Sequence, residues 1–351
     1  MAEKNFLITG GYGFIGSCLI RELLKNKINK VCNIDKLTYS SSKDSIKTFN
    51  NNNYSFEKVD ISEPMHVRGV ILNFKPDVIF NLAAESHVDR SIDNPDDFIK
   101  SNINGTFTLL NESYGYWKML SGVKKSKFRF IHISTDEVYG SLKSKELPFV
   151  EESLYKPNSP YSASKASSDH LVRSWYKTYS LPTIVTNTSN NYGPWQFSEK
   201  LIPLVISKCL KKEKIPIYGN GLQIRDWIRV EDHISGLITV LNKGKVGEKY
   251  NIGANKELTN IQVINNICDI LNELIPIKDF SYRELMVFVE DRPGHDNRYA
   301  INNTKIKNLG WSPSISWDEG IRDTVNWYLK NKFFLNSHEQ KNYSGERLGK
   351  L

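Results

Sequence analysis

The feature that most constrains this chain is a glycine-rich turn near its start, between an apolar run and an amphipathic one. Residues 6–9 (FLIT) predict a buried strand, residues 10–16 (GGYGFIG) a tight turn, and residues 17–25 a helix. The glycines satisfy both G-x-G-x-x-G and the looser G-x-x-G-x-x-G. Such a turn lets the backbone N–H groups at a helix start approach a pyrophosphate. The sequence therefore predicts a dinucleotide-binding unit.

A second apolar run, residues 31–34, ends in Asp35. An acid at this distance from the glycines is expected to bind the adenosine ribose diol, and its charge repels a 2′-phosphate. We therefore expect NAD rather than NADP, although the neighbouring Lys36 leaves NADP open.

Strand-like runs at residues 54–59 and 78–82 alternate with helical stretches at residues 65–74 and 95–114. This alternation is typical of an α/β fold with a Rossmann-type doubly wound parallel sheet. With 351 residues and 39% apolar composition, the chain can bury more than one core. After residue 190 the alternation loosens, which predicts a smaller mixed α/β substrate-binding lobe.

The two parts are expected to interleave along the chain. We assign the Rossmann domain to residues 1–189, rejoined by about 228–255 and 314–331, and the second lobe to residues 190–227, 256–313 and 332–351.

Two adjacent acids follow a further strand-like run, residues 130–133 (FIHI). Thr135, Asp136 and Glu137 stand where the carboxyl end of that strand should open into a crevice. Two carboxylates in different environments can divide the work of an acid and a base. The alternative is a solvated acidic turn, but the position after a buried strand favours catalysis.

Tyr161 and Lys165 are four residues apart, after a helix start indicated by Ser159 and Pro160. Both side chains should share one helix face. Because an ammonium group favours a nearby phenolate, we expect Lys165 to lower the pKa of Tyr161 and make it a general base. The alternative is an ordinary amphipathic pair. Bulky residues on more than one face of residues 161–179 predict a homodimer through this helix.

Charge and cysteine usage exclude several classes of function. The formal charge of +8 suits an anionic ligand, but Lys and Asn are widely spread, so no nucleic-acid partner is expected. The four cysteines form no CxxC pair, which argues against a disulfide framework or a metal site. No apolar run approaches the ~20 residues of a membrane span. We expect a soluble cytoplasmic protein.

Longer motifs then point to a family. They are residues 134–140 (STDEVYG), 190–194 (NNYGP), 216–219 (PIYG), 223–227 (QIRDW) and 291–296 (DRPGHD). With these motifs the chain resembles the dTDP-glucose 4,6-dehydratases, a family of the extended short-chain dehydrogenase/reductase superfamily, from residue 6 to the tail. The resemblance implies a cytoplasmic, homodimeric hydro-lyase of deoxysugar biosynthesis, such as the rhamnose pathway, acting on dTDP-glucose.

The resemblance also implies contacts, residue by residue. NAD would be contacted by Gly10, Gly13, Phe14, Ile15, Gly16, Asp35, Lys36, Leu37, Thr38, Asp60, Ile61, Leu82, Ala83, Ala84, Glu85, Ser101, Tyr161, Lys165 and Asn191. The sugar nucleotide would be contacted by Ser86, His87, Thr135, Asn190, Lys200, Leu201, Pro216, Ile217, Tyr218, Arg225, Asn260, Arg292, His295 and Tyr343.

The implied mechanism uses one redox couple twice. Tyr161, with Thr135 orienting the hydroxyl, takes the proton at carbon 4 as hydride passes to NAD. Glu137 then removes the hydrogen at carbon 5 while Asp136 protonates the departing carbon 6 hydroxyl, and the hydride returns to carbon 6. The sequence departs from the family at Tyr12, Trp195 and Ser198 and in a shorter loop at residues 143–148.

Three alternatives remain. A UDP-glucose 4,6-dehydratase differs only by one methyl group on the base, worth ~1–3 kcal/mol in an apolar pocket. A nucleotide-sugar 4-epimerase would need Tyr161 and Lys165 but no acid and base after Thr135. A non-catalytic NAD-binding sensor would not need these groups together.

Overall fold

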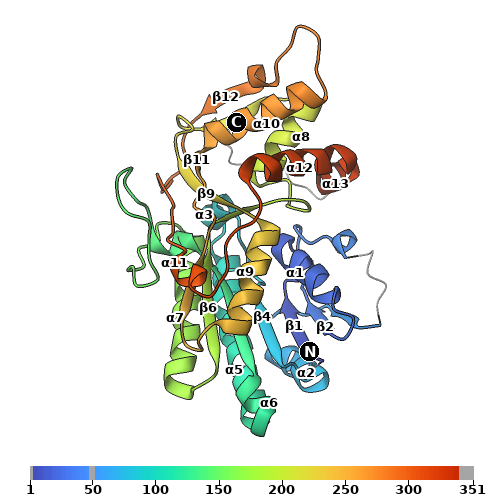
Figure 1. The fold of residues 1–351 in the computed structure, drawn as a ribbon, viewed down its shortest axis with the longest axis vertical. Coiled ribbons are helices and arrows are strands. Elements are labelled where there is room, and N and C mark those ends of the chain that lie inside the picture. The colour runs from blue at the N-terminus through green and yellow to red at the C-terminus, as the bar shows by residue number, and fades with distance from the viewer. Residues whose placement is uncertain (1–2, 47–51, 340–351) are drawn as a thin grey trace.

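A seven-stranded parallel sheet lies at the centre of the larger lobe in the computed structural model, which describes residues 3–46 and 52–339 (Figure 1). Its strands, in spatial order, are β10 (Lys249–Ile252), β6 (Thr183–Thr188), β5 (Arg129–Thr135), β4 (Val78–Asn81), β1 (Asn5–Thr9), β2 (Lys30–Ile34) and β3 (Tyr54–Glu57). All the pairings in it are parallel, so the expected doubly wound sheet is confirmed.

Helices cover both faces of this sheet. One face carries α1 (Phe14–Leu24) and α9 (Val230–Lys243), and the other carries α2 (Pro64–Phe74), α5 (Gly105–Met119) and α7 (Pro160–Tyr179). Strand β1 shows why: Phe6 and Ile8 point to the first face and Leu7 to the second, and all three are buried. Shorter helices are α3 (Val88–Asp93), α4 (Asp96–Phe98), α6 (Gly122–Lys127) and α11 (Thr304–Lys307).

The second lobe has its own apolar core, at the top of Figure 1. It contains the helices α8 (Leu201–Lys211), α10 (Asn260–Leu274), α12 (Trp317–Lys330) and α13 (Lys332–Glu339). Its two small sheets are β11 (Glu257–Thr259), β9 (Ile224–Arg229) and β7 (Asn190–Tyr192), and β12 (Met286–Val289) with β8 (Ile215–Tyr218).

Helix α12 differs from the expected division of the chain. We placed residues 314–331 with the nucleotide-binding domain, but Trp317, Ile321 and Val325 are buried in the second lobe's core, against α8 and α10. The apolar stripe of an amphipathic helix does not reveal which of two cores it covers, so the sequence pattern alone could not place it.

The helical stretch expected at residues 95–114 is interrupted. Between α4 and α5 the segment Ile99–Asn104 has the wider π-helical turn. This wider turn carries Asn102, whose side chain bonds both backbone groups of Glu85 (2.9 and 3.0 Å) and the Ser164 hydroxyl (2.8 Å). Helix α5 is thereby joined to the loop after β4 and to α7, and such bulges are frequent at functional sites.

The strand order places a crevice between the carboxyl ends of β1 and β4, where the winding of the sheet reverses. The Thr9 hydroxyl holds this place together, because it donates to Asn81 Oδ1 (2.8 Å) and accepts from the N–H groups of Leu82 (3.1 Å) and Ala83 (2.9 Å). The glycine turn after β1 therefore lies directly against the loop after β4.

Gly10 is required by this contact, and Gly16 by the tightness of the turn itself. Gly10 has φ +67° and a Cβ there would lie 2.8 Å from Ala83 Cα, while a Cβ on Gly16 would lie 2.3 Å from the Gly10 carbonyl oxygen. The unusual Tyr12 fits the turn: its ring packs on Phe56, with ring centres 4.9 Å apart.

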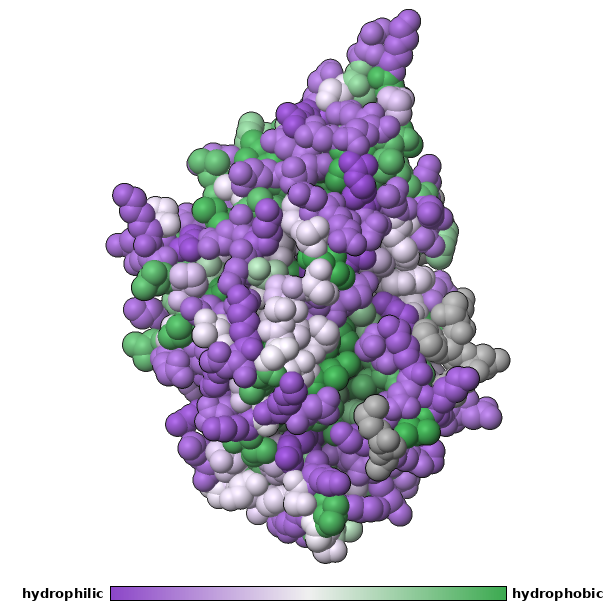
Figure 2. Space-filling view, in the orientation of Figure 1, coloured by the Kyte–Doolittle hydropathy of each residue, from purple (hydrophilic) through white to green (hydrophobic). Residues whose placement is uncertain are grey.

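The surface in the view of Figure 2 is mostly hydrophilic, with apolar residues in separate patches. Within residues 3–46 and 52–339, no helix combines the length and the apolar character that crossing a bilayer would need.

We predict that Gly16→Ala opens the turn. The added methyl group meets backbone atoms, which cannot move aside as a flexible side chain would, so the expected cost is about 1–3 kcal/mol with loss of dinucleotide affinity. Thermal unfolding and NAD titration measure both. Gly69→Ala in α2 is the control, since nothing lies within 4 Å of its Cβ position. Equal behaviour of the two variants would contradict the tight turn.

Candidate active site

One cavity opens at the carboxyl ends of the central strands, and it brings together most of the expected site residues. All five expected catalytic residues line it: Thr135, Asp136, Glu137, Tyr161 and Lys165. The expected cofactor residues that also line it are Gly10, Gly13, Phe14, Ile15, Gly16, Asp35, Lys36, Thr38, Ile61, Leu82, Ala83, Ala84, Glu85, Ser101 and Asn191. Leu37 and Asp60 stand outside this lining, and the Asp60 carboxylate bonds Ser62 instead.

Asp35 is buried and already has structural partners. Its carboxylate accepts from the backbone N–H groups of Tyr12 (3.0 Å) and Leu37 (2.8 Å) and from the Ser41 hydroxyl (3.0 Å). It therefore fastens the end of β2 to the glycine turn. Its contact with a ribose stays a prediction.

Three of the expected cofactor residues form a small cluster on the cavity wall. Lys36 Nζ donates to the Ser101 hydroxyl (2.7 Å) and lies 3.1 Å from Glu85 Oε1. The Lys36 charge is thus shared with a carboxylate, which makes it a weaker attraction for a 2′-phosphate than the sequence suggested.

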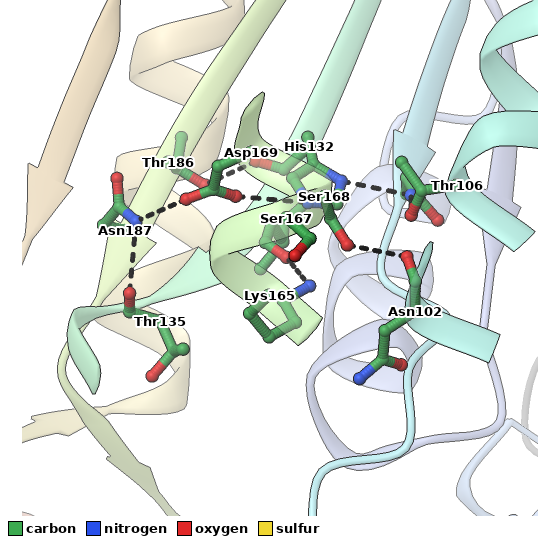
Figure 3. A network of polar contacts seen from close by, with 12 residues as sticks. Asn102, Thr106, His132, Thr135, Lys165, Ser167, Ser168, Asp169, Thr186 and Asn187 are labelled. Carbon is green, nitrogen blue, oxygen red and sulfur yellow. Dashed lines mark hydrogen bonds and ion pairs between the residues drawn. The ribbon is translucent and has the colours of Figure 1, made fainter. Parts of the chain in front are cut away.

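The phenol and the ammonium group stand on the buried face of α7. This helix begins at Pro160, and Ser159 caps it by accepting from the Ser162 N–H (3.1 Å), as the sequence predicted. Tyr161 and Lys165 are both buried, and Lys165 Nζ donates to the Ile133 carbonyl on β5 at 2.8 Å (Figure 3).

The pKa values in this pair differ from the sequence expectation. We expected Lys165 to lower the pKa of Tyr161, but burial and the nearby Glu137 charge raise it. Burial also lowers the pKa of Lys165 to about 8. Loss of hydration on burial thus disfavours both the Tyr161 phenolate and the Lys165 ammonium.

The two acids after β5 have different surroundings. Burial, together with the Glu137 charge, raises the pKa of Asp136 well above its usual range, which favours the protonated form of this carboxyl group. Burial also raises the pKa of Glu137, but the charges of Arg292, Arg225 and Lys200 oppose that effect. The arrangement suits Asp136 to donate a proton and Glu137 to accept one.

Asn190 and Lys200 of the second lobe line the cavity, while Tyr218 and Arg225 lie outside its lining. Lys200 Nζ donates to the Ser86 carbonyl (2.7 Å), and both residues line the cavity together with Asn190. Tyr218 lies edge-on to His295, with ring centres 6.0 Å apart. Arg225 lies over the Tyr299 ring (4.2 Å) and donates to the Asp296 carbonyl (3.0 Å).

Asp89 on α3 is a residue that the sequence interpretation missed. It is buried and bonds two expected substrate residues, the Tyr218 hydroxyl (2.7 Å) and Arg292 Nη1 (2.9 Å). Because α3 belongs to the larger lobe, this carboxylate joins the two lobes. The sequence offered one indication of its role, since Asp89 follows the expected substrate residue Ser86 by three positions.

Glu199 was missed as well. It lines the cavity and accepts from the Tyr39 hydroxyl (3.3 Å), and Arg90 Nε lies 3.4 Å from it. Arg90 also lies over the Tyr39 ring (3.9 Å). The departures from the family pattern nearby are accommodated: Ser198 is buried, and Trp195 packs on Trp327 with ring centres 4.8 Å apart.

Several expected substrate residues do not line the cavity, and Tyr218, Arg225, Arg292 and His295 are among them. The Ile217 side chain points into the second lobe's apolar core, because β8 alternates its faces, and Pro216 precedes it in the same strand. Leu201 packs on that core, Asn260 begins α10, and His87 caps α3 by accepting from the Arg90 N–H (3.4 Å). Tyr343 lies outside the described residues.

This fold, with a glycine turn, a Tyr-Lys pair on one helix and a second lobe over the crevice, defines an extended short-chain dehydrogenase/reductase. The chain matches the family model described as GDP-mannose 4,6 dehydratase over residues 7–324. It is 53% identical over 332 residues to dTDP-glucose 4,6-dehydratase from Haemophilus influenzae, which covers 93% of this chain and 98% of that protein. The chain belongs to the dTDP-glucose 4,6-dehydratase family.

Solved structures agree with this family. DesIV (dTDP-glucose 4,6-dehydratase) from Streptomyces venezuelae, solved with NAD bound, has a TM-score of 0.87 at 36% identity, covering 95% of this chain and 99% of that one. UDP-glucose 4-epimerase from Thermus thermophilus has a TM-score of 0.82 at 24% identity, covering 93% and 99%. The epimerase shares the fold, so the fold by itself does not separate the two reactions.

We predict that Asp226 on β9, whose charge acts on Asp136, makes the stability of the protein depend on pH. Burial raises its pKa from 3.8 to about 6, although it accepts from the Lys256 N–H (2.7 Å). Because the pKa of Asp226 is higher in the folded than in the unfolded state, its contribution to the free energy of unfolding is complete below the unfolded-state pKa. It is lost as the pH rises through the folded-state pKa, here by about 3 kcal/mol between roughly pH 4 and 7.

Asp226→Asn should remove that part of the fall. Denaturant unfolding of both proteins across this pH range measures it, and the difference between the two curves isolates Asp226 from other buried acids. Asp269→Asn, at an exposed carboxylate paired with Arg283, is the control. Parallel curves for wild type and Asp226→Asn would exclude the buried charge as the cause.

Proposed function

We propose that this chain is an NAD-dependent hydro-lyase that converts dTDP-glucose to dTDP-4-keto-6-deoxyglucose and water. One observation carries the proposal: Asp136 and Glu137 line the same cavity as Tyr161 and Lys165. Oxidation alone needs only the phenol and the ammonium group. Loss of water from a neighbouring carbon needs an acid and a base as well, and both are present.

The residues at the glycine turn fit NAD. No side chain of the described residues caps α1, and its first turn contains no acid, so the N–H groups of Phe14 and Ile15 remain for an anion. The cradle has room only while Gly16 lacks a Cβ. Bound at this turn, NAD would supply the hydride acceptor for carbon 4 and the hydride that carbon 6 later receives.

Tyr161 acts first in this scheme, taking the proton from the carbon 4 hydroxyl. Its burial next to Glu137 disfavours the phenolate, so the ammonium group of Lys165 would have to supply the opposing positive charge. Thr135, the last residue of β5, orients the sugar hydroxyl toward the phenol.

The ketone at carbon 4 makes the hydrogen at carbon 5 acidic. Glu137 takes that proton, and the neutral Asp136 gives its own proton to the carbon 6 hydroxyl, which leaves as water. After hydride returns to carbon 6, Glu137 can give its proton back to carbon 5. The sugar is then rearranged without net oxidation.

The nucleotide part would lie against the second lobe. Tyr218 offers an aromatic face to the base, and Arg225 and Arg292 offer planar donors to the diphosphate. The relatives named above support dTDP-glucose over UDP-glucose. Within the cell we place the enzyme in the cytoplasm, where sugar nucleotides are available.

We predict that Glu137→Gln reduces dehydration by about 10²–10⁴-fold but leaves the first oxidation intact. With dTDP-glucose, NADH absorbance should rise and persist, while NMR should detect little 4-keto-6-deoxy product. Glu22→Gln, at an exposed residue of α1, is the control and should behave as wild type.

Two outcomes would contradict this assignment. Normal product formation by Glu137→Gln would remove Glu137 from its role, and wild-type conversion of dTDP-glucose to the galactose epimer would favour the epimerase. Parallel assays with UDP-glucose test the base, for which a ~10–200-fold preference for dTDP-glucose is expected.

We also propose that two chains associate through α5 and α7. These helices pack side by side and present an aromatic cluster in which Phe107 (48% exposed) lies against Trp175, and Trp175 against Tyr179 (43% exposed). Tyr114 completes the cluster beside Tyr179. Large exposed aromatic residues gathered on two helices are typical of an interface.

Phe107→Glu should convert the dimer to a monomer, because an unpaired carboxylate would be buried in the interface. Light scattering after size exclusion measures the mass. Phe288→Glu is the matched control, since Phe288 is 60% exposed on β12 in the second lobe. A dimer that persists in Phe107→Glu would exclude this face.

A further inference from the structure

Two loops, one from each lobe, border the crevice in which the dinucleotide is proposed to bind. The loop after β2, residues 35–42, belongs to the larger lobe, and the loop before α8, residues 193–200, leads into the second lobe. Residues of both loops line the cavity. Tyr39 lies where the two loops meet, and no step of the proposed reaction uses it.

Tyr39 stands at the tip of a turn whose base is fastened to the glycine turn. The Ser41 N–H group closes the turn by donating to the carbonyl three residues earlier (3.1 Å). The Ser41 hydroxyl donates to the Asp35 carboxylate (3.0 Å), and the Ser42 N–H group donates to the Tyr12 carbonyl (2.9 Å). The turn is therefore held by the same contacts that hold the cofactor side of the crevice.

The Tyr39 side chain contacts both the second lobe and α3. Its ring lies edge-on to Phe197, with ring centres 5.5 Å apart, and its hydroxyl donates to Glu199 Oε1 (3.3 Å). The Arg90 guanidinium lies over the same ring (3.9 Å), and Arg90 Nε is 3.4 Å from Glu199 Oε2. Phe197 and Glu199 are buried, and burial raises the pKa of Tyr39, so its hydroxyl keeps the proton that it donates.

We propose that Tyr39 is a positioning residue that retains the dinucleotide, because it fastens the loop after β2 to the loop before α8 across the mouth of the crevice. This inference rests on the function proposed above. In that reaction the hydride taken from carbon 4 must return to carbon 6 of the same sugar. A reduced cofactor that left between these two steps would strand the oxidised sugar, so a contact that delays opening of the crevice serves the reaction.

Other contacts join the two lobes independently of Tyr39. Lys200 Nζ donates to the Ser86 carbonyl (2.7 Å), and Arg292 Nη1 donates to the Asp89 carboxylate (2.9 Å). The second lobe also has an apolar core of its own. Loss of the Tyr39 side chain should therefore release the loop after β2 without separating the lobes.

The test is the rate at which NADH leaves the full-length protein when Tyr39 is replaced by alanine. Protein loaded with NADH is mixed with excess NAD, and the decay of NADH fluorescence gives the dissociation rate constant. Tyr39→Ala removes a cation–π contact, an aromatic contact and a hydrogen bond, so dissociation should be about 10–100-fold faster than in wild type. Thermal unfolding without the dinucleotide measures the stability of each variant separately.

Two further variants separate the ring from the hydroxyl and from general loosening. Tyr39→Phe keeps both ring contacts and loses only the 3.3 Å hydrogen bond, so dissociation should be about 2–5-fold faster. Tyr176→Ala is the matched control, because Tyr176 is a half-buried tyrosine on α7 outside the cavity lining, and it should release NADH at the wild-type rate. Tyr39→Leu is a second ring-free variant that keeps apolar bulk, and it should behave as Tyr39→Ala.

The outcomes separate the two proposals. A wild-type protein that holds NADH without converting dTDP-glucose contradicts the proposed function alone. If NADH leaves Tyr39→Ala or Tyr39→Leu no faster than it leaves wild type or Tyr176→Ala, only the role of Tyr39 is overturned. If neither ring-free variant folds while Tyr39→Phe does, Tyr39 is a structural residue and the retaining role is likewise overturned.

Discussion

The hydrogen bonds of Thr9 are the contact on which the rest of the structure depends. A single hydroxyl at the end of β1 donates to Asn81 and accepts from two backbone N–H groups of the loop after β4. Three of the possible bonds of this hydroxyl are thus used where the sheet reverses its winding. The glycine turn, the Asp35 carboxylate and the loop after β4 are then fixed against one another, and the floor of the cavity exists before any ligand arrives.

Several ionisable side chains lie next to this cavity, shielded from water. Asp136, Lys165 and Asp169 are buried, and each has a hydrogen-bond partner, while Glu137 is half-buried beside them. Burial disfavours every ionised form, so the differences between the sites come from the nearest charges. Glu137 has arginines nearby and Asp136 has a carboxylate, which is the asymmetry that an acid and a base require.

Much of this arrangement could be predicted from sequence because it is local. The glycine turn, the capped start of α7 and the acids after β5 each depend on neighbours within a few residues, and the structure has them as expected. The missed features depend on distant parts of the chain. Asp89 meets Arg292 across 203 positions, and α12 chooses between two cores that look alike from its own apolar stripe. The pKa of Tyr161 was misjudged for a related reason, since helical spacing shows a partner but not the depth of burial.

The pairing of Asp89 with Arg292 has a consequence for which molecules can occupy the second lobe. Asp89 bonds Nη1 of the Arg292 guanidinium and offsets its charge, so an incoming anion must compete with an internal carboxylate for this arginine. A ligand with several negative oxygens gains more binding free energy from Arg292 than a ligand with one. We therefore expect the second lobe to favour a ligand with several negative oxygens, such as a diphosphate, over a lone carboxylate.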